Sequence, residues 1–150
     1  MPYRDRIFIF ATRVVLTSVI WHAAMSTAVA QDVNPDYKSF EKAVLDGRDV
    51  RLILDLSRCT GHGVEARGPQ VRGSIRFDAY MIRGDQTVAF ATTHFTLRSD
   101  NTAVDEFLSF RVYPNGKVNV RTAFLNPITF SVTQEAQFDC DIGQGATFHW

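Results

Sequence analysis

The sequence predicts a mainly β fold of the α+β class: an antiparallel meander of six or seven strands, curved or barrel-like, with one N-terminal amphipathic helix. From residue 50 onward, apolar residues recur at every second position in short runs that turn residues separate. Between residues 35 and 46, apolar residues recur at helical spacing instead. Strands joined by tight turns pair with their neighbours in the chain. The pattern does not distinguish a closed barrel from a sheet folded over the helix.

The first thirty residues are predicted to be a signal peptide. Arg4 and Arg6 precede an apolar run at 14–25, Arg13 is the last charge before it, and an A-x-A site ends at Ala30. This is the pattern of a secretory signal peptide cleaved after Ala30. An uncleaved membrane anchor is the alternative, but the run is shorter than the ~20 residues of a bilayer span. We therefore expect a periplasmic or secreted protein with no stable membrane span after processing.

Residues 31–150 are predicted to form a single globular domain, since 120 residues match the usual size of one domain. This segment has 13 basic and 15 acidic side chains, a formal charge of −2. The basic residues are mostly single arginines dispersed among apolar residues. No concentrated patch of one sign therefore favours binding to nucleic acid or to anionic lipid.

The two cysteines of the chain, Cys59 and Cys140, both follow the predicted cleavage site. In an oxidising compartment two cysteines can form one intramolecular disulfide. Two buried free thiols or a redox-active pair are the alternatives. Because the sequence has no C-x-x-C spacing, it does not indicate a redox motif, and a structural disulfide is the prediction.

The helix is expected over residues 35–46, with Pro35 at an early position and Gly47 at its exit. Its apolar stripe comprises Tyr37, Phe40, Val44 and Leu45. The first strand follows, with apolar residues at Val50, Leu52, Leu54 and Leu56, and residues 58–70 form a Gly-containing loop.

The remaining strands are expected from period-two alternation and from turn residues between the runs. They are predicted over residues 71–81, 87–98, 104–113, 117–125, 128–132 and 136–142, before a short apolar end at 146–150. Asn115-Gly116 between two alternating runs is the clearest hairpin signal in the chain.

Several segments of the chain resemble the VirK family of small exported bacterial proteins. They are LDLSRCT at 54–60, GSIRFDAY at 73–80, THFT at 93–96, FRVYPNG at 110–116 and CDIGQGATF at 140–148. The resemblance covers nearly all of residues 31–150 in the same order and with similar spacing. It implies an exported protein associated with virulence regulation in plant-associated bacteria. It implies no catalytic residues, because no biochemical activity is established for the family.

Three histidines follow the predicted cleavage site, His62, His94 and His149. Three histidines could bind zinc, but no two of these lie at the short spacing of a metal motif. Gly61-His62-Gly63 also lacks the other residues of a nucleotide-binding loop. We therefore predict neither a metal nor a cofactor.

His94 is the main candidate for a functional side chain. It lies in the middle of a predicted strand, where a histidine is usually buried and makes one structural hydrogen bond. That structural role is the prediction, and His94→Ala is then expected to cost ~1–3 kcal/mol. A functional role would need a partner across the sheet, such as Asp55, Asp78 or Tyr80.

No assembled catalytic set is visible in the sequence. Ser57, Ser74, Ser109 and Ser131 could act as nucleophiles, but none lies in a G-x-S-x-G motif. Aromatic residues are numerous, and those on the outside of a sheet could line an apolar groove. We therefore predict a non-enzymatic, virulence-associated exported protein that binds a small apolar or amphipathic ligand, or a protein. The alternatives are an envelope enzyme that uses His94 as acid or base, and a structural or stability factor in the envelope.

Overall fold

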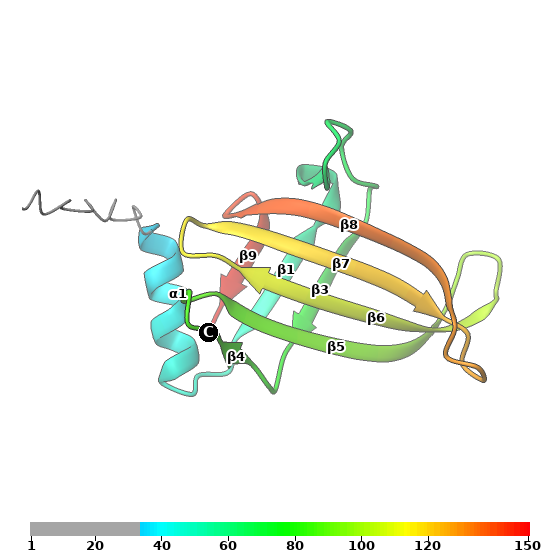
Figure 1. Cartoon of the computed structure of the whole chain (residues 1–150), viewed down its shortest axis with the longest axis horizontal. Coiled ribbons are helices and arrows are strands. Elements are labelled where there is room, and N and C mark those ends of the chain that lie inside the picture. Colours follow the sequence, from blue (N-terminus) through cyan, green and yellow to red (C-terminus); the bar gives the residue numbers. More distant parts are fainter. Residues whose placement is uncertain (1–33) are drawn as a thin grey trace, which may run out of the picture.

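A computed structural model describes residues 34–150 (Figure 1). The predicted signal peptide and its cleavage after Ala30 lie outside these residues. The described elements are α1 (Pro35–Leu45), β1 (Arg51–Asp55), the 3-10 turn η1 (Leu56–Arg58), β2 (Thr60–Gly61), β3 (Arg72–Arg76), β4 (Met81–Ile82), β5 (Val88–Leu97), β6 (Ala103–Val112), β7 (Lys117–Leu125), β8 (Val132–Ile142) and β9 (Gly145–His149).

All nine strands of the described segment belong to one curled sheet. Eight follow the order β3-β1-β9-β8-β7-β6-β5-β4, and the short β2 pairs with β8. Figure 1 shows β5 to β8 as four long strands side by side, with α1 at one end and the β5–β6 and β7–β8 turns at the other. We call the end away from α1 the distal end. The predicted mainly β fold with one helix is confirmed, and β3 and β4 are the ends of an open path.

The strand β9 is the main departure from the predicted meander. It lies between β1 and β8, with Leu52 opposite Phe148, and it pairs with β8 in parallel at only two positions. The sequence analysis assigned this segment to an apolar end. Its partner β1 is almost the whole described chain away, so no local pattern reveals the pairing, although the buried Ala146 and Phe148 alternate as in a strand.

Two predicted strands are shorter than expected. The run at 71–81 is extended only in β3 and β4, and residues 77–80 between them form no strand. The run at 128–132 is a turn up to Val132, where β8 begins. The Asn126 side chain accepts hydrogen bonds from the backbone N–H groups of Ile128 and Thr129, and this local turn outweighs the β-forming tendency of the apolar residues.

The helix α1 begins where the sequence predicts. The Asn34 side chain accepts hydrogen bonds from the backbone N–H groups of Asp36 and Tyr37, at 2.8 and 3.3 Å, and so caps the first turn. Gly47 follows the helix with φ of +68°, as expected for its exit. The buried face consists of Tyr37, Phe40, Ala43 and Val44. The prediction that Leu45 joins this face is wrong, since Leu45 is exposed.

A chain of aromatic rings joins the helix to the sheet. Phe40 of α1 contacts Phe148 of β9 with ring centroids 4.1 Å apart, and it also contacts Phe77. Phe77 stacks on Phe90 of β5 at 3.8 Å, and Phe90 stacks on Phe110 of β6 at 4.7 Å. Aromatic contacts of this kind add stability beyond the burial of their area. The helix, β9, β5 and β6 therefore share one core.

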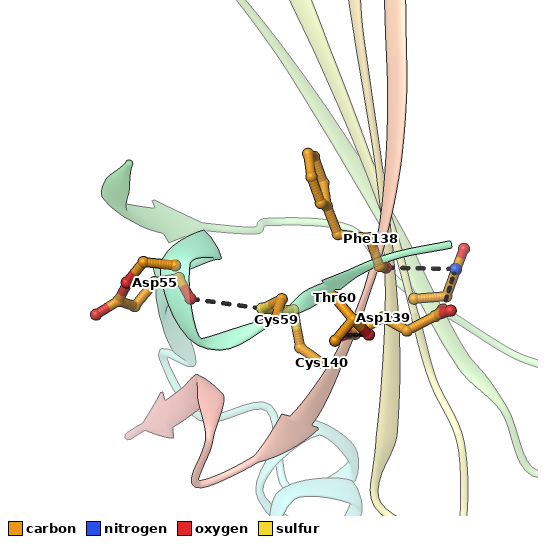
Figure 2. The surroundings of a disulfide bond; sticks show 8 residues. Asp55, Cys59, Thr60, Phe138, Asp139 and Cys140 are labelled. Atoms are coloured by element: carbon orange, nitrogen blue, oxygen red, sulfur yellow. Dashed lines mark hydrogen bonds between the residues drawn. A yellow bond between two sulfur atoms is a disulfide. The ribbon is translucent and has the colours of Figure 1, made fainter. Parts of the chain in front are cut away.

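The predicted disulfide between Cys59 and Cys140 is present, with the two Cα atoms 4.5 Å apart. Figure 2 shows it joining the segment after η1 to β8, beside the pairing of Thr60 with Asp139. Both cysteines are buried. Gly145 packs so closely that a Cβ atom there would lie 2.6 Å from the Cys59 Sγ atom. The disulfide thus fixes the junction of β8, β9 and the loop after β1.

Candidate functional site

An apolar hollow lies on the outer face of the sheet, which is the face opposite the core. In β5 and β6 the even-numbered Phe90 and Phe110 point into the core, so the odd-numbered residues occupy the outer face. The hollow has a volume of about 450 Å³. Its lining comprises Ala79, Tyr80, Met81, Ala89, Phe90, Ala91, Ser109, Phe110 and Arg111. We call it the outer hollow.

Small side chains create the outer hollow. Ala89 lies opposite Met81 of β4 and opposite Arg111 of β6, and Ala91 lies opposite Ser109. The two alanines and the serine form a low floor between longer side chains on both sides. Met81 is 64% exposed, so an apolar side chain at the rim is open to solvent. A floor and rim of this kind suit an apolar ligand group.

Arg111 gives the outer hollow a single cationic group. It is exposed, and within residues 34–150 its guanidinium forms no ion pair, unlike that of Arg121, which pairs with Glu135. An arginine without a carboxylate partner can bind an anionic group such as a carboxylate through two parallel hydrogen bonds. The hollow therefore combines an apolar floor with an unpaired cation at its rim.

A second, more polar hollow of about 240 Å³ adjoins the first. Its lining comprises Val44, Gly47, Arg48, Asp49, Val50, Arg76, Phe77, Asp78 and Tyr80. The Arg76 Nε atom lies 2.8 Å from an Asp49 oxygen and 3.6 Å from an Asp78 oxygen. Tyr80 lines both hollows and is 44% exposed. The structure thus brings together two of the predicted site residues, Asp78 and Tyr80.

His94 lies elsewhere, toward the distal end of β5, and its predicted burial is wrong. Its side chain is 52% exposed, and its Nε2 atom is 3.2 Å from an oxygen of Glu106, the residue directly opposite on β6. The long strands continue beyond the part of the sheet that α1 covers (Figure 1). The same face therefore belongs to the core at Phe90 and is open at His94.

Glu106 is a site residue that the sequence analysis missed. The signal was available, because counting back from the turn at residues 99–101 places position 94 opposite position 106. Asp55 is not a partner of His94, since it lies on β1, which does not pair with β5. Asp55 accepts a hydrogen bond from the Ser57 hydroxyl and pairs with Arg72, and both contacts hold the pKa of Asp55 below its ordinary value.

A second histidine–carboxylate pair, His62 with Asp139, was also missed. The His62 Nδ1 atom lies 2.8 Å from an Asp139 oxygen, and the Asn119 side chain donates to the other oxygen at 2.8 Å. Gln137 in turn donates to the Asn119 side-chain oxygen. Burial raises the pKa of Asp139, but the hydrogen bonds from Asn119 and His62 outweigh this effect and hold it below its ordinary value. The group links the loop after β2 to β7 and β8.

None of the four candidate serines is hydrogen-bonded to either histidine in the described part of the chain. The hydroxyl of Ser57 bonds to Asp55, and that of Ser131 bonds to Thr129. No hydrogen bond links Ser74 or Ser109 to a histidine in the described segment. Residues 34–150 also contain no group of three side chains able to hold a metal ion. Neither histidine pair lines the outer hollow.

The VirK protein family matches residues 33–130, from the start of the described chain through β7. The chain belongs to the VirK family. The crystal structure of a VirK family protein from Legionella pneumophila is similar, with a TM-score of 0.67 and 21% sequence identity. The match covers 76% of this chain and 95% of that one, so the two chains share a fold.

Two curated relatives extend the family relationship across most of the chain. An uncharacterized protein of Sinorhizobium fredii, y4wH, is 28% identical over 134 residues, 89% of this chain and 92% of its own. An uncharacterized protein of Rhizobium radiobacter, from the pinF2 3′ region, is 30% identical over 109 residues, 72% of this chain and 75% of its own. Neither name states an activity. Within residues 34–150, no helix is long and apolar enough to cross a bilayer.

Proposed function

We propose that this VirK family chain is a non-enzymatic exported domain that binds an amphipathic ligand, an apolar group with an anionic head, in the outer hollow. One observation carries the proposal: a hollow with a floor of small side chains has the unpaired Arg111 at its rim. The volume of about 450 Å³ lies within the usual range of small-molecule sites. The apolar group would lie on Ala89 and Ala91, with its anionic head toward Arg111.

Export forms part of the same proposal. The disulfide between Cys59 and Cys140 supports an oxidising compartment, because such bonds are rare in the cytosol. The N-terminal pattern that ends at Ala30 supports a periplasmic or secreted location after cleavage. N-terminal sequencing of the exported protein should begin at Gln31. The association with virulence that the family resemblance implied stays a prediction.

The enzyme alternative receives less support. His94 and Glu106 could supply a base and a carboxylate, but they lie outside both hollows described above. Within residues 34–150, neither side chain of this pair is hydrogen-bonded to a candidate serine nucleophile, which is the contact that nucleophilic catalysis requires.

Calorimetric titration with decanoate and with its uncharged methyl ester tests the binding proposal. Ala89→Leu fills the floor of the hollow and should weaken binding of both probes at least tenfold. Arg111→Gln removes the cation and should weaken decanoate about tenfold, the loss expected for one charged hydrogen bond, while leaving the ester unchanged.

Arg121→Gln is the matched control for Arg111→Gln, because Arg121 lies on the same face but outside the hollow and is paired with Glu135. It should leave both affinities unchanged. Binding of neither probe by the folded protein, or equal losses in the two arginine variants, would contradict the proposal.

A further inference from the structure

One side of β5 is open along most of its length. β6 pairs with β5 from Val88 to Leu97, whereas β4 covers the other side only at Val88 and Ala89. Within the described chain, residues 91–97 thus form a free sheet edge. A strand of seven residues extends for about 23 Å, which is long for an exposed edge.

The backbone groups that face this open side can be identified from the neighbouring turns. The Arg98 N–H donates to the Thr102 carbonyl on the β6 side, and the Thr87 carbonyl accepts from Arg83 on the β4 side. Successive residues of a strand direct these groups to opposite neighbours. The odd-numbered residues Ala91, Thr93, Phe95 and Leu97 therefore direct their N–H and C=O groups away from β6, toward the open edge.

This edge lacks the features that normally prevent strand pairing. The segment from 91 to 97, ATTHFTL, contains no Lys, Arg, Asp, Glu, Pro or Gly, and its register with β6 is unbroken by a bulge. Phe95 and Leu97 are 64% and 58% exposed on it. Edge strands of monomers usually carry charges, prolines or bulges. The strand at the opposite end of the sheet, β3, does carry charges, because its sequence RGSIR contains two arginines.

We propose that residues 91–97 pair antiparallel with the same residues of a second copy of this chain, about a two-fold axis at His94. In this register Ala91 lies opposite Leu97 and Thr93 opposite Phe95, twice each by symmetry. All four outward-facing residues of each copy then form backbone hydrogen bonds. The two sheets join into one, and the interface is isologous, as in most homodimers.

The side chains of this edge favour a second copy as the partner strand. On the outer face, the large Leu97 falls opposite the small Ala91, where the outer hollow provides room. Phe95 falls opposite the β-branched Thr93, a stabilising type of cross-strand pair. Shifting the axis to Thr93 would place Leu97 opposite Ala89, which β4 already covers. Shifting it to Phe95 would leave Ala91 unpaired. The axis at His94 is thus the one that uses the whole edge.

Disulfide trapping tests this register. In the proposed dimer, the two residues at position 94 form a non-hydrogen-bonded pair with Cα atoms about 4.5 Å apart, which a disulfide can bridge. His94→Cys should therefore form a covalent dimer on mild oxidation, visible on a non-reducing gel. Thr96→Cys is the control, because its equivalent in the other copy lies about 13 Å away along the strand. Monomeric His94→Cys, or equal trapping of both variants, would overturn the proposal.

Sedimentation equilibrium of the full chain as purified provides a second measurement without new cysteines. The wild-type protein should form dimers. Thr93→Pro should raise the dimer dissociation constant at least tenfold, because the lost N–H faces the open edge and makes no bond to β6. Thr93→Val keeps that N–H and should retain the dimer. A wild-type protein that stays monomeric, or a dimer insensitive to Thr93→Pro, would overturn the proposal. Both measurements use protein without added ligand, because in the proposed dimer Leu97 of the second copy lies beside Ala91, on the floor of the outer hollow.

Discussion

Tyr37 shows how one buried hydroxyl can set the response of the whole protein to alkaline pH. Its ring is fully buried, and its hydroxyl donates to the Gln86 carbonyl and contacts Glu41. Burial, together with the neighbouring Glu41 carboxylate, raises the pKa of Tyr37 above its ordinary value. The folded protein therefore holds this proton more tightly than the unfolded chain does.

We predict that the free energy of unfolding falls as pH rises above the ordinary tyrosine pKa of about 10, because only the unfolded chain then loses the proton readily. Tyr37→Phe should remove this contribution to the pH dependence. At neutral pH the variant should lose about 0.5–1.5 kcal/mol with its hydrogen bond. Urea unfolding of both proteins from pH 8 to 11 measures the effect. Parallel pH curves for the two proteins would contradict the assignment.

His94, unlike Tyr37, is exposed, although the sequence analysis predicted that it is buried. Because the His94 side chain is 52% exposed and its Nε2 atom contacts a Glu106 oxygen, its replacement leaves no buried cavity. We therefore predict that His94→Ala changes the free energy of unfolding of the monomer by less than about 1 kcal/mol. Phe90→Ala is the control two pairs away on the same face, and it should cost about 3–5 kcal/mol. Thermal unfolding at low protein concentration compares them.

At the scale of elements, the start of α1 and the β6–β7 turn depend on each other. The Asn34 N–H donates to the Pro114 carbonyl at 2.8 Å, so the residue that caps the helix also lies against the hairpin. Gly116 has φ of +83°, and a Cβ atom there would lie 2.6 Å from the side-chain Nδ2 atom of Asn34. The absence of a side chain at Gly116 is thus what lets the helix cap reach the turn.

We predict that Gly116→Ala destabilises the protein more than Gly47→Ala does. Both glycines have positive φ, so each substitution carries the backbone cost of about 1–2 kcal/mol for a left-handed residue. Only at Gly116 does the added atom meet a neighbour, since no atom lies within 4 Å of a Cβ placed on Gly47. Denaturant unfolding of the two variants measures the difference, and equal losses would argue against the contact with Asn34.

Elements with strong local signals were predictable from the sequence. The helix start at Pro35, the strand from Val50 and the Asn115-Gly116 hairpin depend on residues close together in the chain, and the structure has all three. The turn at residues 126–131 was missed because one polar side chain, Asn126, outweighs a run with β-forming tendency. The outer hollow was unforeseen as a site because it needs the register of β4, β5 and β6 together. Of its residues, Tyr80 and Ser109 were singled out beforehand, Tyr80 as a partner of His94 and Ser109 as a nucleophile.

At the scale of the whole molecule, the disulfide joins parts of the chain 81 residues apart. We predict that replacing Cys59 and Cys140 together by serine lowers the free energy of unfolding by about 2–5 kcal/mol. Reduction of the wild-type protein should lower its melting temperature to that of the double variant. The double variant serves as the control, because a reducing agent should not change its melting temperature. A wild-type melting temperature unaffected by reduction would contradict the structural role of the bond.

The position of β9 has a consequence for how the molecule is made. A ribosome delivers residues 145–149 after all the other described strands, yet these residues lie between β1 and β8 and join the two parts of the sheet. Until they emerge, β5 to β8 can form their hairpins, but β1 and β3 can pair only with each other, and the two-residue β2 is the part of this early region that pairs with β8. Pairing over such long sequence separations is also slow. The nascent chain therefore stays incompletely folded throughout its synthesis, and the complete sheet assembles only once its latest strand is available.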